Sequence, residues 1–294
     1  MSRIKCCRLC PRMCGAERTD NAPSAGVCAM PSAAYVSKAM LHMWEEPPIS
    51  GTRGAGTIFF SGCTLGCVYC QNYEISRGKC AIAGKPVTAA GLAEIMERLE
   101  AQGAHNIELV TATQFVPQVI AALKLRPATV PVVWNSSGYE REAVIDALAP
   151  YVDIWLPDYK YALPKPAERF SGAADYPETA LRALLRMRAH QPEDVFDGDI
   201  MQKGMIVRHL VLPLNVRNSI EVLRNMAEHL PGTLVSLMGQ YTPIPGLEAY
   251  PGLQRPITPH EYERVCDAAA ELGIEGFAQE LESSDCHYIP HWDI

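Results

Sequence analysis

The sequence has no long apolar run and no dense basic run. No stretch reaches the roughly 18 uninterrupted apolar residues that a membrane helix needs, and residues 1–15 lack the apolar core of a signal peptide. Lys and Arg number 26 against 33 Asp and Glu, which gives a formal net charge of −7 and argues against nucleic acid as the main partner. We therefore expect a cytoplasmic protein with no membrane or nucleic-acid partner.

Two common catalytic motifs are also missing. The chain contains no Walker-type phosphate-binding loop and no Gly-x-Ser-x-Gly nucleophile motif, so kinase and serine-hydrolase functions are unsupported. Its 294 residues, 48% hydrophobic and 20% charged, are instead typical of a large globular unit that can bury a sizeable core.

Cysteine, in contrast, is abundant. Eleven cysteines are hard to interpret as disulfides in a reducing compartment, which favours metal ligation or redox chemistry. They form an N-terminal group, a second group and a scattered remainder: Cys6, Cys7, Cys10, Cys14 and Cys28; Cys63, Cys67 and Cys70; and Cys80, Cys266 and Cys286. Buried inert thiols are common, so we expect no chemical role for the scattered three.

From residue 57 onward, short apolar runs alternate with amphipathic segments. The predicted strands span 57–61, 107–113, 132–136, 154–158, 205–212 and 234–238, and the predicted helices span 89–101, 116–123, 140–148, 177–189 and 220–229. Near-continuously apolar strands that alternate with helices imply a helix-covered parallel sheet, either curled into a barrel or doubly wound. Six units are too few for a full barrel, so an α/β partial barrel is predicted.

The flanking segments differ in composition from this repeat. Residues 1–32 are predicted to form a small Cys-rich metal-binding knuckle, and 33–56 an extended connector in which Met40, His42 and Trp44 alternate. The run from Glu45 to Pro48 should then break any strand or helix. The barrel should occupy 57–240, and 241–294 should form a Pro-rich loop and a helix over 261–272 that packs on the barrel.

Three cysteines lie immediately after the first predicted strand, in Cys63-Thr-Leu-Gly-Cys67-Val-Tyr-Cys70. A barrel places its active-site loops at this end of its strands. Three thiolates on a [4Fe-4S] cluster leave the fourth iron open to another ligand. A zinc site with three thiolates is the alternative interpretation.

The spacing of this motif, with Tyr69 just before its last cysteine, resembles the radical S-adenosylmethionine (SAM) signature. Other segments are similar to one branch of that superfamily, the pyruvate formate-lyase activating enzyme-like PflX family; they lie at 45–51, 59–63, 70–76, 103–107, 135–139 and 208–213. The resemblance covers nearly the whole chain and implies a partial (β/α)6 barrel of the radical SAM type. It also implies a [4Fe-4S] cluster at Cys63, Cys67 and Cys70 whose open iron binds SAM, which is cleaved to methionine and a 5′-deoxyadenosyl radical.

The same resemblance implies SAM contacts at the strand ends. The family's Gly-Gly-Glu motif is replaced here by Thr111-Ala112-Thr113, whose hydroxyl and backbone groups could bind the SAM amino group; ordinary β-branched packing is the alternative. Asn135 and Ser136 correspond to a polar position that contacts the ribose or the methionine carboxylate.

Three further positions could contact the cofactor. Asp158-Tyr159-Lys160 is similar to an Asp-x-Lys pair whose lysine meets the SAM carboxylate, with a surface ion pair as the alternative. His209 is interpreted either as a hydrogen-bonded core residue or as a cofactor contact, and Arg208 should point the opposite way on its strand. Gln240 and Tyr241 could reach the adenine or the substrate.

The N-terminal cysteines suggest a separate metal site. Cys7, Cys10, Cys14 and Cys28 supply four thiolates, enough for a closed tetrahedral zinc site or a second iron-sulfur cluster, and Cys6 could replace Cys7. Residue types alone do not separate the two metals.

The resemblance to activating enzymes suggests hydrogen-atom abstraction from a glycyl residue of a partner, a glycyl-radical enzyme, with a low-potential flavodoxin or ferredoxin as electron donor. Radical modification of a peptide or small molecule is a second reading, since fold does not decide substrate. A third is a non-catalytic iron-sulfur electron carrier or metal-binding protein. That protein would need no SAM site, so the polar strand ends count against it.

Overall fold

Strands joined by helices make up most of the chain in the computed structural model, which describes residues 3–76 and 82–278. The elements follow in the order β1 (Ala34–His42), α1 (Pro47–Ser50), β2 (Ala55–Phe60), α2 (Tyr73–Ser76), β3 (Lys85–Val87), α3 (Ala89–Ala101), β4 (Ile107–Val110), η1 (Thr113–Phe115), α4 (Val116–Leu125), β5 (Val132–Ser136), α5 (Glu142–Leu148), β6 (Ile154–Pro157), α6 (Pro164–Ser171), α7 (Tyr176–His190), β7 (Val195–Asp197), β8 (Ile200–Leu210), α8 (Val216–His229), β9 (Leu234–Met238), η2 (Pro251–Leu253), α9 (Pro259–Glu271) and β10 (Gly276–Ala278).

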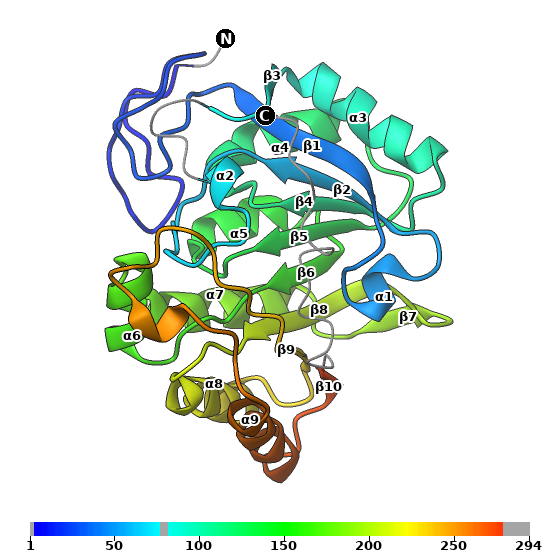
Figure 1. The fold of residues 1–294 in the computed structure, drawn as a ribbon. Coiled ribbons are helices and arrows are strands. Elements are labelled where there is room, and N and C mark those ends of the chain that lie inside the picture. Colours follow the sequence, from blue (N-terminus) through cyan, green and yellow to red (C-terminus); the bar gives the residue numbers. More distant parts are fainter. Residues whose placement is uncertain (1–2, 77–81, 279–294) are drawn as a thin grey trace.

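The strands form a ten-stranded sheet in the order β10-β9-β8-β6-β5-β4-β2-β1-β3, with β7 paired to β8 (Figure 1). From β2 to β9 the neighbours are parallel and follow the order of the chain without reversal. Because right-handed crossovers that all advance in one direction place their helices on one face, this order produces a curved, barrel-like sheet rather than a doubly wound one. The predicted partial-barrel fold is confirmed.

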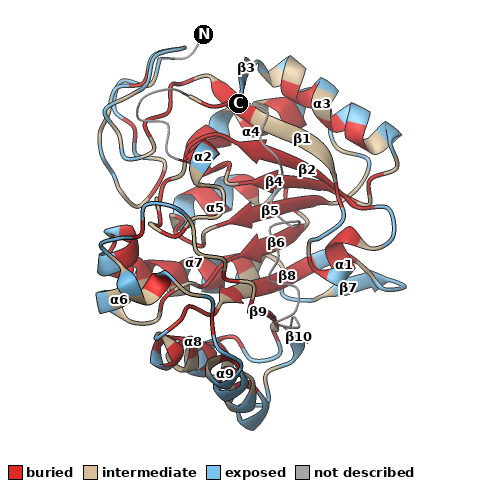
Figure 2. Cartoon of the chain, in the orientation of Figure 1, coloured by how far each residue is buried: buried red, intermediate tan, exposed pale blue. Residues whose placement is uncertain are grey.

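The two faces of the sheet carry different side chains. The outer face is apolar and packs with the helices in the main core, as Ile58, Leu109, Trp134, Trp155 and Val207 show. On the inner face, a smaller apolar cluster closes the barrel near the strand starts; it contains Ile49 of α1 with Ala55, Val133, Ile154, Leu156, Met201 and Ile206. The sheet is buried on both faces along most of its length (Figure 2).

The segment predicted as an extended connector contains regular structure. β1 pairs antiparallel with β2, and its partners include Met40 with Thr57. Pro47 and Pro48 do not break a helix but begin α1, because the first helical turn needs no backbone N–H donor and suits the fixed φ of proline. The prediction that 45–48 interrupts any helix is therefore wrong.

The second predicted strand is shorter than expected. β4 ends at Val110, and Thr111 adopts a left-handed conformation with φ of 57° before the chain turns into η1. Thr111 to Thr113 thus leave the sheet, whereas β5 and β9 have the predicted bounds.

The N-terminal residues 3–32 form loops beside the edge where β2 and β4 end (Figure 1). Their backbone pairs with itself through Ile4 and Arg18. In the described ranges, no helix has both the length and the apolar character required to cross a membrane.

Candidate active site

The carboxyl ends of the parallel strands open onto one cavity of about 240 Å³. Its walls combine the cysteine loop after β2 with polar strand ends. The residues predicted from sequence that line it are Cys63, Cys67, Tyr69, Cys70, Thr111, Asn135, Ser136, Asp158, Lys160 and Gln240. Parallel α/β sheets place their ligand sites at this edge.

The three thiols line the cavity together, Cys67 buried and Cys63 and Cys70 half-buried. Burial raises the pKa of Cys63 to about 12, and the neighbouring Cys70 and Cys67 thiols raise it further. Each of two sulfurs accepts a hydrogen bond: Cys63 Sγ from the Leu65 N–H at 3.4 Å, and Cys67 Sγ from the Ser171 hydroxyl at 3.1 Å. Hydrogen bonds of this kind stabilise thiolates that bind metal.

The donor set fits a cluster better than it fits a closed metal site. Across residues 3–76 and 82–278, no three His, Cys, Asp or Glu side chains are arranged to hold a metal ion as they stand, so ligation would have to draw the thiols together. Three soft thiolates in a roomy cavity suit an iron-sulfur cluster with one iron left for an outside ligand.

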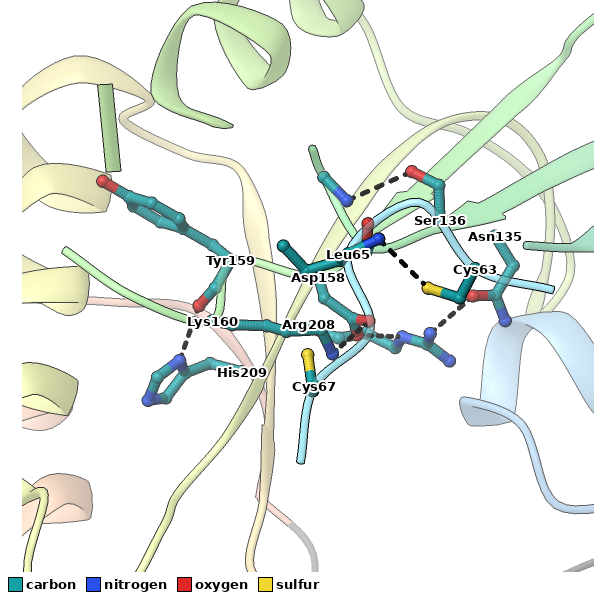
Figure 3. Close-up of polar contacts among 12 residues, drawn as sticks. Cys63, Leu65, Cys67, Asn135, Ser136, Asp158, Tyr159, Lys160, Arg208 and His209 are labelled. Atoms are coloured by element: carbon teal, nitrogen blue, oxygen red, sulfur yellow. Dashed lines mark hydrogen bonds and ion pairs between the residues drawn. The ribbon is translucent and has the colours of Figure 1, made fainter. Parts of the chain in front are cut away.

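A buried ion network lies beside the thiols (Figure 3). Lys160 Nζ lies 2.7 Å from Asp158 Oδ2, and Arg208 Nε lies 3.1 Å from Asp158 Oδ1. Burial opposes ionisation of Asp158, but the charges of Arg208 and Lys160 outweigh it and hold the pKa of Asp158 below its ordinary value. The side chains of Lys160 and Asp158 are only 16% and 12% exposed, so this pair is not a surface ion pair.

Arg208 connects this pair to β5 and to the segment between β1 and α1. Its Nη2 donates to Asn135 Oδ1 at 2.5 Å (Figure 3), and its Nη1 lies 3.1 Å from Glu45 Oε2. Asn135 in turn donates to Glu108 at 2.7 Å. Sequence reasoning assigned no site role to Arg208 or Glu45, although two-residue alternation along β8 was a usable signal: if His209 faces the core, Arg208 faces the barrel interior.

Carboxylates outnumber the two cations of this network. Glu46 and Glu108 are buried and the side chain of Glu45 is 9% exposed, and burial raises the pKa of each above its ordinary value. For Glu45, the attraction of Arg208 works in the opposite direction. These carboxyl groups form an acidic floor of the cavity, and their ionised forms depend strongly on the positive charge of Arg208.

Two predicted cofactor contacts lie outside the cavity. His209 is on the outer face of β8, fully buried, with Nδ1 at 2.7 Å from the Tyr159 carbonyl and Nε2 at 2.8 Å from Ser219 Oγ. Figure 3 shows its ring directed away from the thiols. His209 is therefore a core residue and not a cofactor contact, because both ring nitrogens already have hydrogen-bond partners.

Thr113 is the second predicted cofactor contact that lies outside the cavity. Because the chain leaves the sheet at Thr111, Thr113 turns into η1, where its hydroxyl donates to Glu140 at 2.5 Å and is buried. Thr111 does line the cavity. Tyr241 is also buried, with its hydroxyl donating to the Leu253 carbonyl, whereas Gln240 lines the cavity.

Tyr69, the aromatic residue of the cysteine motif, is linked to Cys67 through a chain of hydroxyl groups. Its ring is 4% exposed, and its hydroxyl accepts a hydrogen bond from Tyr161 at 2.7 Å. Tyr161 also bonds to Ser171 Oγ at 2.8 Å, and Ser171 donates to Cys67. A chain of hydroxyls thus leads from the aromatic residue of the motif to one of its sulfurs.

The N-terminal cysteines meet at a second, much smaller cavity. Cys7, Cys10, Cys14 and Cys28 all line it, whereas Cys6 is not part of its wall; Cys6 and Cys14 are both exposed. Of the scattered cysteines, Cys266 is half-buried on α9. Cys80 and Cys286 lie outside the described residues.

Comparisons with known proteins agree with this geometry. The model of a 4Fe-4S single cluster domain matches residues 50–176, which include the cysteine loop and the strand ends through β6. An uncharacterized protein of Methanocaldococcus jannaschii is 26% identical over 283 residues, covering 92% of this chain and 76% of its own.

The fold is similar to that of a solved structure at low sequence identity. SuiB of Streptococcus suis is similar with a TM-score of 0.50 and 11% identity, over 78% of this chain and 50% of its own. A domain of a pyruvate-formate lyase-activating enzyme from Bacteroides vulgatus has a TM-score of 0.38 and 12% identity, over 65% of this chain and 91% of its own. The matched 4Fe-4S model includes the cysteine motif, for which a [4Fe-4S] cluster is the expected cofactor, and the similarity to SuiB concerns the fold alone.

Proposed function

We propose that this chain is a radical SAM enzyme that abstracts a hydrogen atom from a glycyl residue of a partner protein. Cys63, Cys67 and Cys70 would hold the [4Fe-4S] cluster. With one electron from a low-potential flavodoxin or ferredoxin, the cluster and SAM would supply the hydrogen-atom acceptor, because reductive cleavage of SAM gives methionine and a 5′-deoxyadenosyl radical. The observation that carries the proposal is that all three thiols line the same cavity as Asn135 and Lys160.

The residues around the thiols have separate tasks in this proposal. Lys160 would bind the SAM carboxylate, and Asp158, which is itself paired with Arg208, would hold the Lys160 ammonium group in place. Asn135 and Ser136 would orient the ribose or the methionine part, while Thr111 and Gln240 line the remaining wall. Burial of these groups excludes water, which protects a reactive radical and strengthens each polar contact.

The glycyl substrate is supported by the resemblance to activating enzymes. A rim aromatic adds to this argument, because Trp44 lines the cavity and is nevertheless 59% exposed. Exposed aromatic side chains are enriched where proteins and peptides bind.

The test is anaerobic reconstitution of the full chain with iron and sulfide, followed by dithionite and SAM and quantification of 5′-deoxyadenosine. We expect SAM cleavage by the wild type and its loss in Cys67→Ala. Cys266→Ala is the matched control, because it removes a thiol on α9 that does not line the cavity. A wild-type cluster without SAM cleavage, or cleavage that survives Cys67→Ala, would contradict the proposal.

A further inference from the structure

We propose that the N-terminal knuckle binds a single structural Zn²⁺ ion through Cys7, Cys10, Cys14 and Cys28, and that this site anchors the Cys63–Cys70 loop through Arg12. The first part concerns residues that the proposed reaction does not use. The second part rests on the proposed function, because it concerns the loop that would hold the cluster.

Size separates the two metal alternatives that the cysteine spacing leaves open. The cavity among the four cysteines measures about 10 Å³, against about 240 Å³ for the cavity at Cys63, Cys67 and Cys70. A space of roughly 10–15 Å³ admits about one water-sized guest. No three of these cysteine side chains are arranged to hold a metal ion as they stand, so ligation would draw the thiols together around this space, which favours one ion over a cube of four irons and four sulfides.

The donor set and its surroundings favour zinc as that ion. Four thiolates form the closed tetrahedral set of structural zinc sites. Such a site carries an excess of negative charge, and the buried guanidinium of Arg18 lies beside it, with Nη1 3.7 Å from Cys7 Sγ. The other hydrogen bonds of Arg18 go to the carbonyls of Met30, Pro31 and Gln114. Because carbonyls carry no net charge, the positive charge of Arg18 can offset the negative charge of the thiolates.

Arg12 lies between two of the proposed ligands, Cys10 and Cys14, and reaches the cysteine loop. It donates to the carbonyls of Thr64 at 3.1 Å and Leu65 at 2.9 Å, which lie between Cys63 and Cys67. It also donates at 2.6 Å to the carbonyl of Ser171, whose hydroxyl bonds to Cys67 Sγ. A metal that fixes Cys10 and Cys14 therefore fixes Arg12, a positioning residue for the loop.

Metal analysis of the anaerobically reconstituted full chain tests the zinc site. We expect about one zinc and about four irons per chain in the wild type, and loss of zinc with retention of iron in Cys28→Ser. Cys6→Ser is the matched control and should keep both metals, because Cys6 is exposed and outside the small cavity. About eight irons without zinc, a mononuclear iron signal, or disulfides in place of metal would overturn the assignment.

A second measurement covers the case in which Cys28→Ser does not fold. Titration of the wild type with a mercurial that modifies thiols should release about one zinc, and the release should require modification of the N-terminal cysteines as identified by peptide mapping. Zinc release that follows modification of Cys63, Cys67 or Cys70 instead would overturn the site.

The role of Arg12 is tested by Arg12→Ala, with zinc content, the electron paramagnetic resonance spectrum and the reduction potential of the cluster as readouts. We expect unchanged zinc, a changed spectrum and a shifted potential. Arg3→Ala is the control, since Arg3 is exposed and pairs with Glu17 inside the knuckle. An unaltered spectrum and potential in Arg12→Ala would refute the anchoring.

If the wild type binds zinc but no cluster forms at Cys63, Cys67 and Cys70, the proposed function fails while the zinc assignment stands.

Discussion

The hydroxyl of Ser171, the last residue of α6, donates a hydrogen bond of 3.1 Å to the sulfur of Cys67. The two residues are 104 positions apart in the sequence, and both are buried. Ser171 is held in place by Tyr161 at its hydroxyl and by Arg12 at its carbonyl. The electron density on one proposed cluster ligand is thus controlled by a residue outside the cysteine motif.

Ser171→Ala should lower the reduction potential of the cluster. A hydrogen bond to a thiolate stabilises the more negative, reduced state, and a loss of about 1 kcal/mol corresponds to about 40 mV for one electron. A redox titration followed by electron paramagnetic resonance measures the shift. Tyr161→Phe keeps Ser171 and its bond to Cys67, so it should change the potential less. An equal or higher potential in Ser171→Ala would contradict this reading.

Lys160→Met should weaken SAM binding by about 10- to 100-fold, because it removes the cation proposed to meet the SAM carboxylate. Equilibrium dialysis with labelled SAM on the reconstituted protein measures the affinity. Lys124→Met, an exposed position on α4, is the matched control. Unchanged affinity in Lys160→Met, with thermal unfolding like that of the wild type, would exclude Lys160 as the contact.

The barrel could be predicted because its signals are local. Apolar strands of four or five residues between turn residues, such as β5 and β9, and helix α3 with its Thr88 cap lie where the pattern placed them. β1 was missed because it lies next to the short edge strand β3 and is only partly buried, so its composition is mixed. The proline pair at 47–48 was misread because proline both ends helices and begins them.

The acidic floor of the cavity could not be predicted for a different reason. Glu45 meets Arg208 across 163 positions of the sequence, and only the path of the β1–α1 segment along the inner face of the sheet brings them together. The strand-end residues Asn135, Asp158 and Lys160 could be located, because parallel strands deliver their last residues to a common edge.

Arg208→Met should destabilise the fold by about 3–5 kcal/mol, because it leaves the carboxylates of Glu45 and Asp158 buried with less opposing charge. Denaturant unfolding of the protein at neutral pH measures the difference. Arg217→Met, an exposed position on α8, should change stability by less than about 0.5 kcal/mol. A small loss in Arg208→Met would indicate that the glutamates are protonated and need no counter-charge.

The core position of His209 predicts a specific pH dependence. Burial lowers the pKa of His209 to about 4, whereas an unfolded histidine titrates near about 6.5. Between these values the unfolded chain binds a proton that the folded chain does not, so the contribution of His209 to stability is complete above about 6.5 and is lost as the pH falls toward about 4. Denaturant unfolding at pH 7.5 and pH 5 should therefore show a smaller pH-dependent loss of stability in His209→Gln than in the wild type.

The His209→Gln variant should retain the wild-type affinity for SAM, because the ring lies outside the cavity. Weakened SAM binding at full thermal stability would return His209 to the site and show that its burial against Tyr159 and Ser219 is not its main role.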